Sequence, residues 1–151
     1  SEEWDIFSDD IWQRERKYAE ESKKCEGKLL IRGYDIDSKA VMAAKQNAEA
    51  AGVSNDVSVE KMSVSKLKIP EKGAIIITNP PYGQRIGSDE EMEIVDKALR
   101  RLMSDNDGLS VFAITSEKGF EKKMGRKADR RRKLYNGRIE TTYYQYHGKK
   151  L

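Results

Sequence analysis

The sequence predicts an α/β fold with a mostly parallel β-sheet and helices on both of its faces. Short apolar runs that end abruptly alternate with longer stretches whose apolar positions recur at helical spacing. Parallel neighbours need such a crossover helix between them, and these crossovers are nearly always right-handed. With 151 residues, the chain is expected to form one domain: a peripheral helical segment at 1–27, then the sheet and its helices at 28–151.

The first half of the chain contains an exposed helix, three strand candidates and one amphipathic helix. Residues 10–24 are rich in charged side chains, which predicts a mostly exposed helix. The apolar run 28–36 predicts a buried strand, and the helical spacing of 39–51 predicts the helix that follows it. Residues 57–62 alternate in hydropathy like a strand. Residues 73–78 (GAIIIT) are the strongest candidate for a buried strand.

The second half predicts one more long helix and an antiparallel edge of the sheet. Residues 89–103 place apolar side chains on one helical face, and 109–115 (LSVFAIT) predict another apolar strand. Residues 116–132 are basic and show no regular pattern. The β-like runs 133–135 and 139–146 are expected to pair as a hairpin-like edge.

Composition excludes several kinds of site. Cys25 is the only cysteine and His147 the only histidine, so one chain can build neither a disulfide framework nor a Cys/His zinc site. The longest apolar runs, such as 74–77, are too short to cross a bilayer, and the polar, acidic start is unlike a signal peptide. A cytoplasmic protein without a membrane partner is therefore expected. The 36% of charged and 37% of apolar residues indicate much exposed surface or missing apolar partners.

The charges are unevenly distributed along the chain. Residues 117–151 hold 12 Lys and Arg against 4 Asp and Glu, whereas residues 1–116 carry more acidic than basic side chains. Clustered cations neutralise phosphates, so the tail predicts an anionic partner, with a solvated basic face as the alternative. RNA is the preferred partner. The candidate contacts are Arg126, Lys127, Arg130, Arg131, Arg132 and Lys133.

Asn79-Pro80-Pro81-Tyr82, directly after the strand 73–78, is the candidate catalytic centre. Proline fixes its own φ and biases the preceding residue to extended conformations, so the segment is expected to be a stiff protrusion. The Asn79 side-chain oxygen and the Pro80 carbonyl could accept both N–H groups of an exocyclic base amine, and Tyr82 could stack on the base. Such acceptors would orient the amine for methyl transfer from a sulfonium. The alternative is a turn that merely ends a strand.

Asp35 lies at the carboxyl end of the strand 28–36, and Asn79 directly follows the strand 73–78, so both are expected at the same edge of the sheet. Ligands of open α/β sheets bind at this edge. An acidic residue in this position bonds ribose hydroxyls in nucleotide-binding folds, and Ile36 could pack against an adenine ring. Helix capping is an equal alternative for Asp35. It is the preferred role for Asp37 and Ser38.

Three segments together resemble a known family: GYDIDSKAVMAAKQNAEAAGV, ITNPPYGQRIG and FEKKMGRKADRRRKLYNGRIETTYYQY. They look like the catalytic domain of the bacterial THUMP-associated methyltransferases, over nearly the whole chain from about Trp4. The resemblance implies a Rossmann-like class I methyltransferase fold with an antiparallel edge. It also implies S-adenosylmethionine as the cofactor and guanine N2 in 23S ribosomal RNA as the methyl acceptor.

By this resemblance, Asp35 would bind the cofactor ribose, Ile36 would line the adenine site, and residues 79–82 would hold the target amine. Where members carry an acidic or polar group after the third strand, this sequence offers Ser63. The family's first strand and glycine-rich cofactor loop are missing, so the resemblance implies the C-terminal part of one catalytic domain. The remaining part of the precursor, or a neighbouring copy, would supply them together with an RNA-binding domain.

Two other functions stay open for this sequence. One is an adenine-N6 methyltransferase that acts on DNA, because the same acceptors suit either base amine. The other is a non-catalytic RNA-binding module that keeps a methyltransferase-like fold. Under the leading interpretation, the chain by itself is expected to be inactive because it lacks the cofactor loop.

Overall fold

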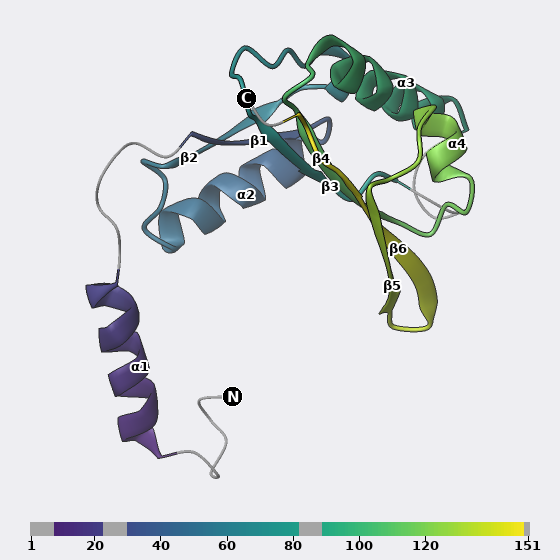
Figure 1. The fold of residues 1–151 in the computed structure, drawn as a ribbon. Helices are drawn as coiled ribbons and strands as arrows, with labels where there is room; N and C mark the ends of the chain where they lie inside the picture. Colours follow the sequence, from purple (N-terminus) through teal and green to yellow (C-terminus); the bar gives the residue numbers. More distant parts are fainter. Residues whose placement is uncertain (1–7, 23–29, 82–88, 150–151) are drawn as a thin grey trace.

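The computed structural model describes residues 8–22, 30–81 and 89–149 (Figure 1). The chain runs through α1 (Asp9–Glu21), β1 (Ile31–Asp35), α2 (Ser38–Ala50), β2 (Val57–Lys61), the 3-10 turn η1 (Val64–Lys66), β3 (Ile75–Thr78), α3 (Asp89–Asp105), β4 (Ser110–Thr115), α4 (Phe120–Met124), β5 (Arg130–Asn136) and β6 (Ile139–Tyr146). The alternation of strands and helices that the sequence predicts is confirmed.

The strands form two hydrogen-bonded groups. In the first, β1 and β2 run parallel, with Ile31 opposite Val57. In the second, the order is β3-β4-β6-β5: β3 and β4 are parallel, and β6 is antiparallel to both of its neighbours. A mostly parallel sheet with an antiparallel edge is therefore confirmed. Helix α2 packs on β1 and β2, and α3 lies beside the larger group (Figure 1).

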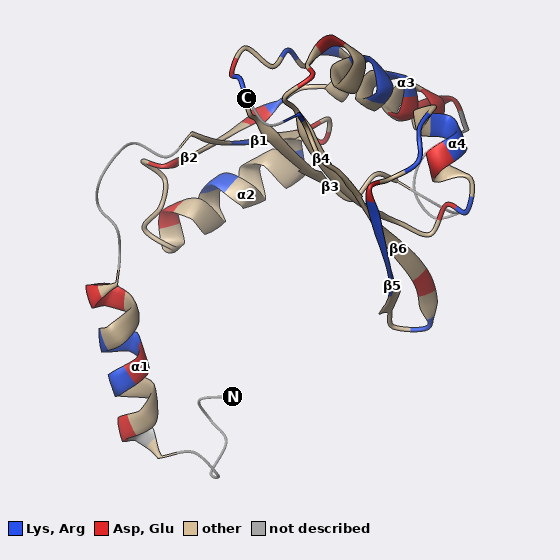
Figure 2. Ribbon diagram, in the orientation of Figure 1, with Lys and Arg blue, Asp and Glu red and all other residues tan. Residues whose placement is uncertain are grey.

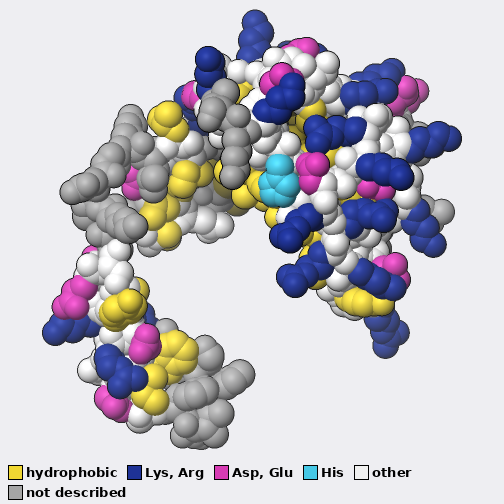
Figure 3. All heavy atoms as spheres, in the orientation of Figure 1, with side chains coloured by type: hydrophobic (Ala, Val, Ile, Leu, Met, Phe, Trp, Pro, Cys, Tyr) yellow, Lys and Arg dark blue, Asp and Glu magenta, His cyan; other side chains and the backbone are white. Residues whose placement is uncertain are grey.

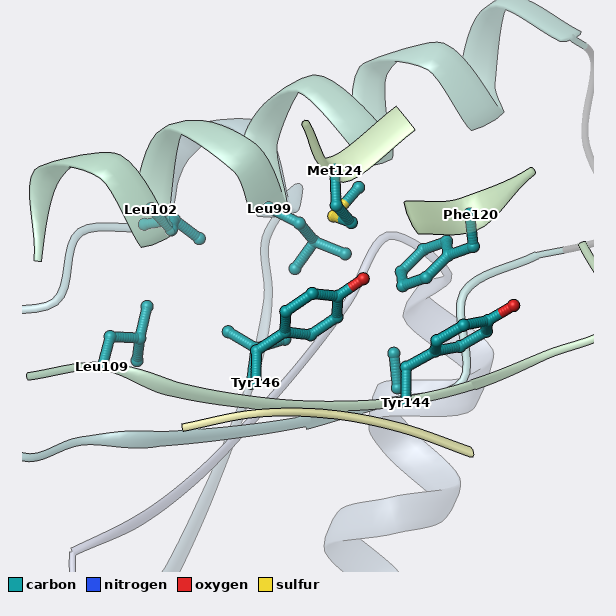
Figure 4. Packing of buried hydrophobic residues seen from close by; sticks show 9 residues of the cluster. Leu99, Leu102, Leu109, Phe120, Met124, Tyr144 and Tyr146 are labelled. Carbon is teal, nitrogen blue, oxygen red and sulfur yellow. The ribbon is translucent and has the colours of Figure 1, made fainter. Parts of the chain in front are cut away.

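The core lies between α3, α4 and one face of the β3-β4-β6-β5 sheet (Figure 4). Alternate residues of β4 are buried, so this strand presents one fully covered face. Full burial of a large apolar side chain stabilises a fold by about 1.5–3 kcal/mol, which makes this cluster the main source of stability. Its members are Leu99, Leu102, Leu109, Val111, Ala113, Phe120, Met124, Tyr144 and Tyr146.

The two strands that sequence predicts as buried are exposed in part. Ile77 of β3 is 81% exposed, Ile75 is 63% exposed, and Ile31 of β1 is 49% exposed. The two runs predicted as buried strands are therefore only partly buried in this chain. Ile75 and Ile77 alternate with the half-buried Ile76, so they share one face of β3, and α2 packs on β1 and β2 rather than on that face. In addition, β1 pairs only with β2 and β3 only with β4, so each keeps one free edge among the described residues. The apolar pattern fits a sheet in which both faces are covered.

The basic stretch 116–132 is more regular than expected. Residues Phe120–Met124 form α4, which Gly125 ends in a left-handed conformation (φ 71°), and β5 already begins at Arg130. Phe120 and Met124 are buried four residues apart, which is the helical signal that the surrounding cations conceal. An ion pair links α4 to α3, because the Lys123 ammonium lies 3.2 Å from Asp96; it also lies 3.3 Å from Glu117, just before α4.

Helix α1 stands apart from the sheets (Figure 1) and exposes most of its side chains, as the sequence predicts. Tyr18, for example, is 67% exposed. Across the described ranges, no helix is both long and apolar enough to span a membrane.

Candidate functional site

A cavity of about 890 Å³ lies between β1 and β3 and reaches the carboxyl ends of both strands. Asp35 and Ile36 line it from the end of β1, and Asn79, Pro80 and Pro81 line it from the end of β3. The structure thus brings together the two candidate groups that lie 44 positions apart in sequence. Convergence at the carboxyl edge is where ligands of open α/β sheets bind.

The cavity includes a slot between β1 and β3 as well as the space at their carboxyl ends. Its walls include Arg32 and Gly33 of β1 and Ile75 to Thr78 of β3, so it extends along both strands and not only past their ends. Within the described residues, no strand pairs with the edges of β1 and β3 that border it. Part of the volume is therefore an interstrand slot, and the ligand-sized part is the end that Asp35 and Asn79 share.

Asn79 is held at the cavity by the chain that flanks it. Thr78 is the last residue of β3, where it pairs with Ala113 of β4, and Pro80, which also lines the cavity, is buried. The Asn79 side chain is exposed at the cavity and makes no hydrogen bond to another described residue. A turn with a purely structural role would favour an Asn79 amide that is hydrogen-bonded within the core. The observed side chain does not have that role. Tyr82, the last residue of the predicted motif, lies outside the described residues.

Asp35 and Asp37 have different hydrogen-bonding roles at the start of α2. Asp37 is the N-cap, because its carboxylate accepts a hydrogen bond from the Lys39 backbone N–H at 2.8 Å. Asp35 Oδ1 accepts from the Asp37 N–H, also at 2.8 Å. Ser38 is the first helical residue, so the expectation that it caps the helix is wrong. One oxygen of Asp35 supports the turn, while the exposed carboxylate still faces the cavity.

Ile36 and Ser63 lie on the same side of the cavity as Asp35. Ile36 is 61% exposed, which is unusual for an isoleucine and leaves its side chain free for a ring to pack on. Ser63 caps η1: its hydroxyl accepts from the Ser65 N–H at 3.3 Å and lies 2.9 Å from the Ser65 hydroxyl. The Ser63 hydroxyl is therefore largely engaged locally.

Sequence reasoning did not single out the apolar lining of this cavity. Met62, at the end of β2, and Ile94 and Val95 of α3 contribute to its wall. The helical spacing of Val95 and Leu99 predicts a buried face of α3, but nothing in that spacing says that the face borders a cavity. Only the arrangement of the strands shows it.

The six basic candidates fall into two groups by their partners. Three are paired: Arg126 with Asp129 at 3.2 Å, Arg131 with Glu121 at 2.9 Å and Lys133 with Glu140 at 2.7 Å. The hydrogen bond to Glu140, followed by one to Tyr135, raises the pKa of Lys133 above its ordinary value. The other three, Lys127, Arg130 and Arg132, form no ion pair with a described residue. Figure 2 shows the concentration of Lys and Arg along β5 and α4.

The four tyrosines near the basic stretch also differ. Tyr144 is 4% exposed and Tyr146 is 1% exposed, so both pack in the core. Tyr143 is half-buried, and Tyr135 is 65% exposed. Among the described residues, no group of three or more His, Cys, Asp and Glu is placed to hold a metal ion.

Comparison with known proteins gives a consistent result. A family model described as "RMKL-like, methyltransferase domain" matches residues 4–145. The chain is 38% identical over 149 residues to a Bacillus subtilis (strain 168) protein named as an RNA methyltransferase, YpsC. The alignment covers 99% of this chain but 39% of that protein. The chain is 32% identical to the Ribosomal RNA large subunit methyltransferase K/L of Syntrophotalea carbinolica, over 93% of this chain and 20% of that protein.

Solved structures agree with the sequence relatives. The crystal structure of the methyltransferase SMU.472, complexed with SAH, superposes with a TM-score of 0.85 at 33% identity, over 99% of this chain and 40% of that one. A structure from Listeria monocytogenes str. 4b F2365, named as an N6-adenine-specific DNA methylase, gives a TM-score of 0.82 at 32% identity, over 99% and 38%. The chain thus spans about two fifths or less of the length of the proteins it matches.

Proposed function

Because this chain belongs to the RMKL-like methyltransferase domain family, we propose that it carries the base-binding part of an enzyme that methylates an exocyclic amino group of a base in RNA. The observation that carries the proposal is the position of Asn79-Pro80-Pro81. This segment lines the cavity at the carboxyl end of β3, opposite Asp35, and the Asn79 amide has no hydrogen-bond partner among the described residues.

Methyl transfer to an exocyclic base amine is favoured by two hydrogen-bond acceptors that hold the amine in a fixed position. An exocyclic amine has two N–H donors, and the Asn79 side-chain oxygen and the Pro80 carbonyl are the acceptors proposed for them. Accepting both hydrogens opposes delocalisation of the nitrogen lone pair into the ring and holds that lone pair in line for attack. The nitrogen then forms a bond to the methyl carbon while the carbon–sulfur bond breaks, and the amine loses one proton to solvent. Tyr82 is proposed to stack on the base.

S-adenosylmethionine supplies the methyl group in this proposal. The cavity fits it at the shared end of β1 and β3, where an exposed carboxylate and an exposed isoleucine lie side by side in sequence. Asp35 would accept hydrogen bonds from the ribose hydroxyls, and Ile36 would pack on the adenine ring. Ser63 is proposed to contribute at the adenine through its backbone, because its hydroxyl already bonds within η1.

We further propose that a strand and loop from elsewhere complete the site. Two observations support this: β1 and β3 each keep a free edge on the same cavity, and the matched relatives are more than twice as long as the matched region. A strand paired with both edges would satisfy their backbone groups, and its side chains would pack beside Ile75 and Ile77. The remaining part of the same precursor, with its cofactor loop and RNA-binding domain, is the proposed source. The chain alone is then inactive.

The proposed acceptor is guanine N2 in 23S ribosomal RNA, a reaction of the cytoplasm. The name of the ribosomal RNA methyltransferase relatives supports RNA, whereas the name of the Listeria structure favours adenine N6 in DNA. A methyl-transfer assay with tritium-labelled cofactor and the full-length protein separates the two. Transfer to ribosomal RNA but not to duplex DNA is expected. Transfer to duplex DNA alone would overturn the choice of RNA.

A further inference from the structure

The cations of β5 point alternately to the two faces of the sheet. Arg131 is opposite Tyr144 in the β5-β6 ladder, and Tyr144 packs against Phe120 of α4, so Arg131 lies on the α4 side of the sheet, although its own side chain is exposed. There its guanidinium bonds Glu121 of α4 at 2.9 Å. Lys133, two positions further, bonds Glu140 of β6 at 2.7 Å. The charges of this face are neutralised within the chain.

The other face of the same strand carries Arg130 and Arg132. Both are exposed, and neither forms an ion pair with a described residue. Arg132 is opposite Tyr143, whose ring stacks on Phe112 with centroids 6.1 Å apart and planes at 23°. His147 meets the Phe112 ring edge-on at 5.6 Å. In Figure 3, Lys and Arg side chains gather on the part of the viewed surface around the chain's single histidine.

The register of the sheet aligns this face with the candidate catalytic rim. Thr78 pairs with Ala113, Ala113 with Tyr144, and Tyr144 with Arg131. The next residue on each outer strand is Asn79 and Arg132, so these two lie level with each other. Strands are spaced about 4.8 Å apart, which puts β5 about 14 Å from β3 across the sheet. A strand of nucleic acid with one base at Asn79 can reach β5 within a few nucleotides.

We propose that the open face of β5, defined by Arg130 and Arg132, binds the phosphate backbone of RNA next to the target base. Arg131 and Lys133 instead hold the hairpin to α4 and to itself. This inference rests on the proposed function, which places the target base at Asn79. The guanidinium groups of Arg130 and Arg132 suit phosphate because each presents several donors in a planar fork and no carboxylate of the described residues forms an ion pair with them.

The test compares two double variants of the full-length protein that remove the same charge from the same strand: Arg130→Gln with Arg132→Gln, and the control Arg131→Gln with Lys133→Gln. The probe is a fluorescently labelled single-stranded RNA oligonucleotide of mixed sequence, titrated over a range of salt concentrations. Each lost phosphate contact flattens the plot of log affinity against log salt by about 0.7. The first variant is expected to lower the slope by about 1.4, and the control to stay close to wild type.

An equal decrease of the salt-dependence slope in both variants would contradict the inference, because it would show that the positive charges of β5 attract RNA equally from both faces of the strand. So would flattening by the control alone, no flattening by either, or an effect confined to DNA of the same sequence. Methyl transfer is measured on the same samples. If the wild type transfers no methyl group but the first variant still loses the expected slope, the proposed reaction fails while the binding face stands.

Discussion

Asn79 and Asp35 differ in how much of their hydrogen-bonding capacity the chain itself uses. The Asn79 amide has no partner among the described residues, whereas one oxygen of Asp35 already accepts from the Asp37 N–H. The exposed Asn79 amide at the cavity wall is therefore available to a ligand, whereas part of the hydrogen-bonding capacity of Asp35 already serves the turn before α2.

Replacing Asn79 by Ala removes one of the two proposed acceptors and nothing that closes the core. We expect kcat to fall by about 100- to 1000-fold, the loss typical of one polar group that stabilises a transition state. Affinity for S-adenosylhomocysteine should be retained in calorimetry. The control is Asn55→Ala, an exposed asparagine far from the cavity ends. Near-normal turnover of Asn79→Ala would remove this side chain from the mechanism.

Asp35→Ala is expected to weaken binding of S-adenosylhomocysteine by about 10- to 100-fold, because a hydrogen bond to a charged group contributes about 1.5–3 kcal/mol. Isothermal calorimetry on the full-length protein measures it. Asp37→Asn is the matched control, since asparagine caps a helix as well as aspartate does. If both variants bind equally well, Asp35 serves only the turn before α2.

At the residue scale, the sequence identifies the carboxyl-edge positions but not their partners. Proline chemistry and strand ends are local features, so Asn79 and Asp35 can be located from the sequence. Which oxygen is occupied depends on a neighbouring backbone N–H, as at Asp37, or on a second hydroxyl, as between Ser63 and Ser65. Such partners follow from the folded chain alone.

Among the elements, the helices and strands with one continuous apolar face are the best predicted. Helix α3 and strand β4 each bury apolar side chains at regular spacing, and the sequence shows this spacing. The sequence does not predict the short α4, because its two buried residues, Phe120 and Met124, stand among lysines. It predicts a shorter β5 than the structure has, because Arg130 to Arg132 are exposed and are held in the strand by pairing with β6.

Strand β6 carries a buried tyrosine that makes stability depend on pH. Tyr146 is 1% exposed, its hydroxyl has no partner among the described residues, and burial, with the nearby Glu121 charge, raises its pKa well above 10.0. The unfolded chain therefore loses the phenolic proton first, near its ordinary pKa. The contribution of Tyr146 to the free energy of unfolding should be constant below that value and fall as the pH rises above it.

We expect Tyr146→Phe to be as stable as wild type, or slightly more so, near neutral pH and to lose less stability between about pH 8 and about pH 11. Urea unfolding at both pH values measures the difference. Tyr135→Phe is the control, because that ring is 65% exposed. If wild type and Tyr146→Phe lose the same free energy of unfolding, ionisation of Tyr146 does not contribute.

On the scale of the whole molecule, the two groups of strands share a cavity but no hydrogen-bonded ladder within the described residues. The sequence predicts one sheet because the apolar pattern of β1 and β3 is that of strands covered on both sides. The exposed Ile75 and Ile77 show where that pattern exceeds what this chain can bury. The apolar pattern of a strand therefore predicts its covered faces, but not which elements of the chain cover them.

If an added strand completes the site, the chain of 151 residues should bind S-adenosylhomocysteine far more weakly than the full-length protein does. Calorimetry on both is the measurement, with circular dichroism to establish that the shorter chain is folded. Equal affinity would show that the cofactor site is complete within these residues and that the slot between β1 and β3 needs no further strand.

Mass spectrometry of nucleosides tests the central claim most directly. Ribosomal RNA lacking the modification is incubated with S-adenosylmethionine and the full-length protein, then digested completely. We predict N2-methylguanosine as the product of the wild type and a loss of nearly all of it with Asn79→Ala. A methyl group found on a ring nitrogen, a carbon or a ribose oxygen would contradict the account, because none of these offers two N–H donors to Asn79 and Pro80.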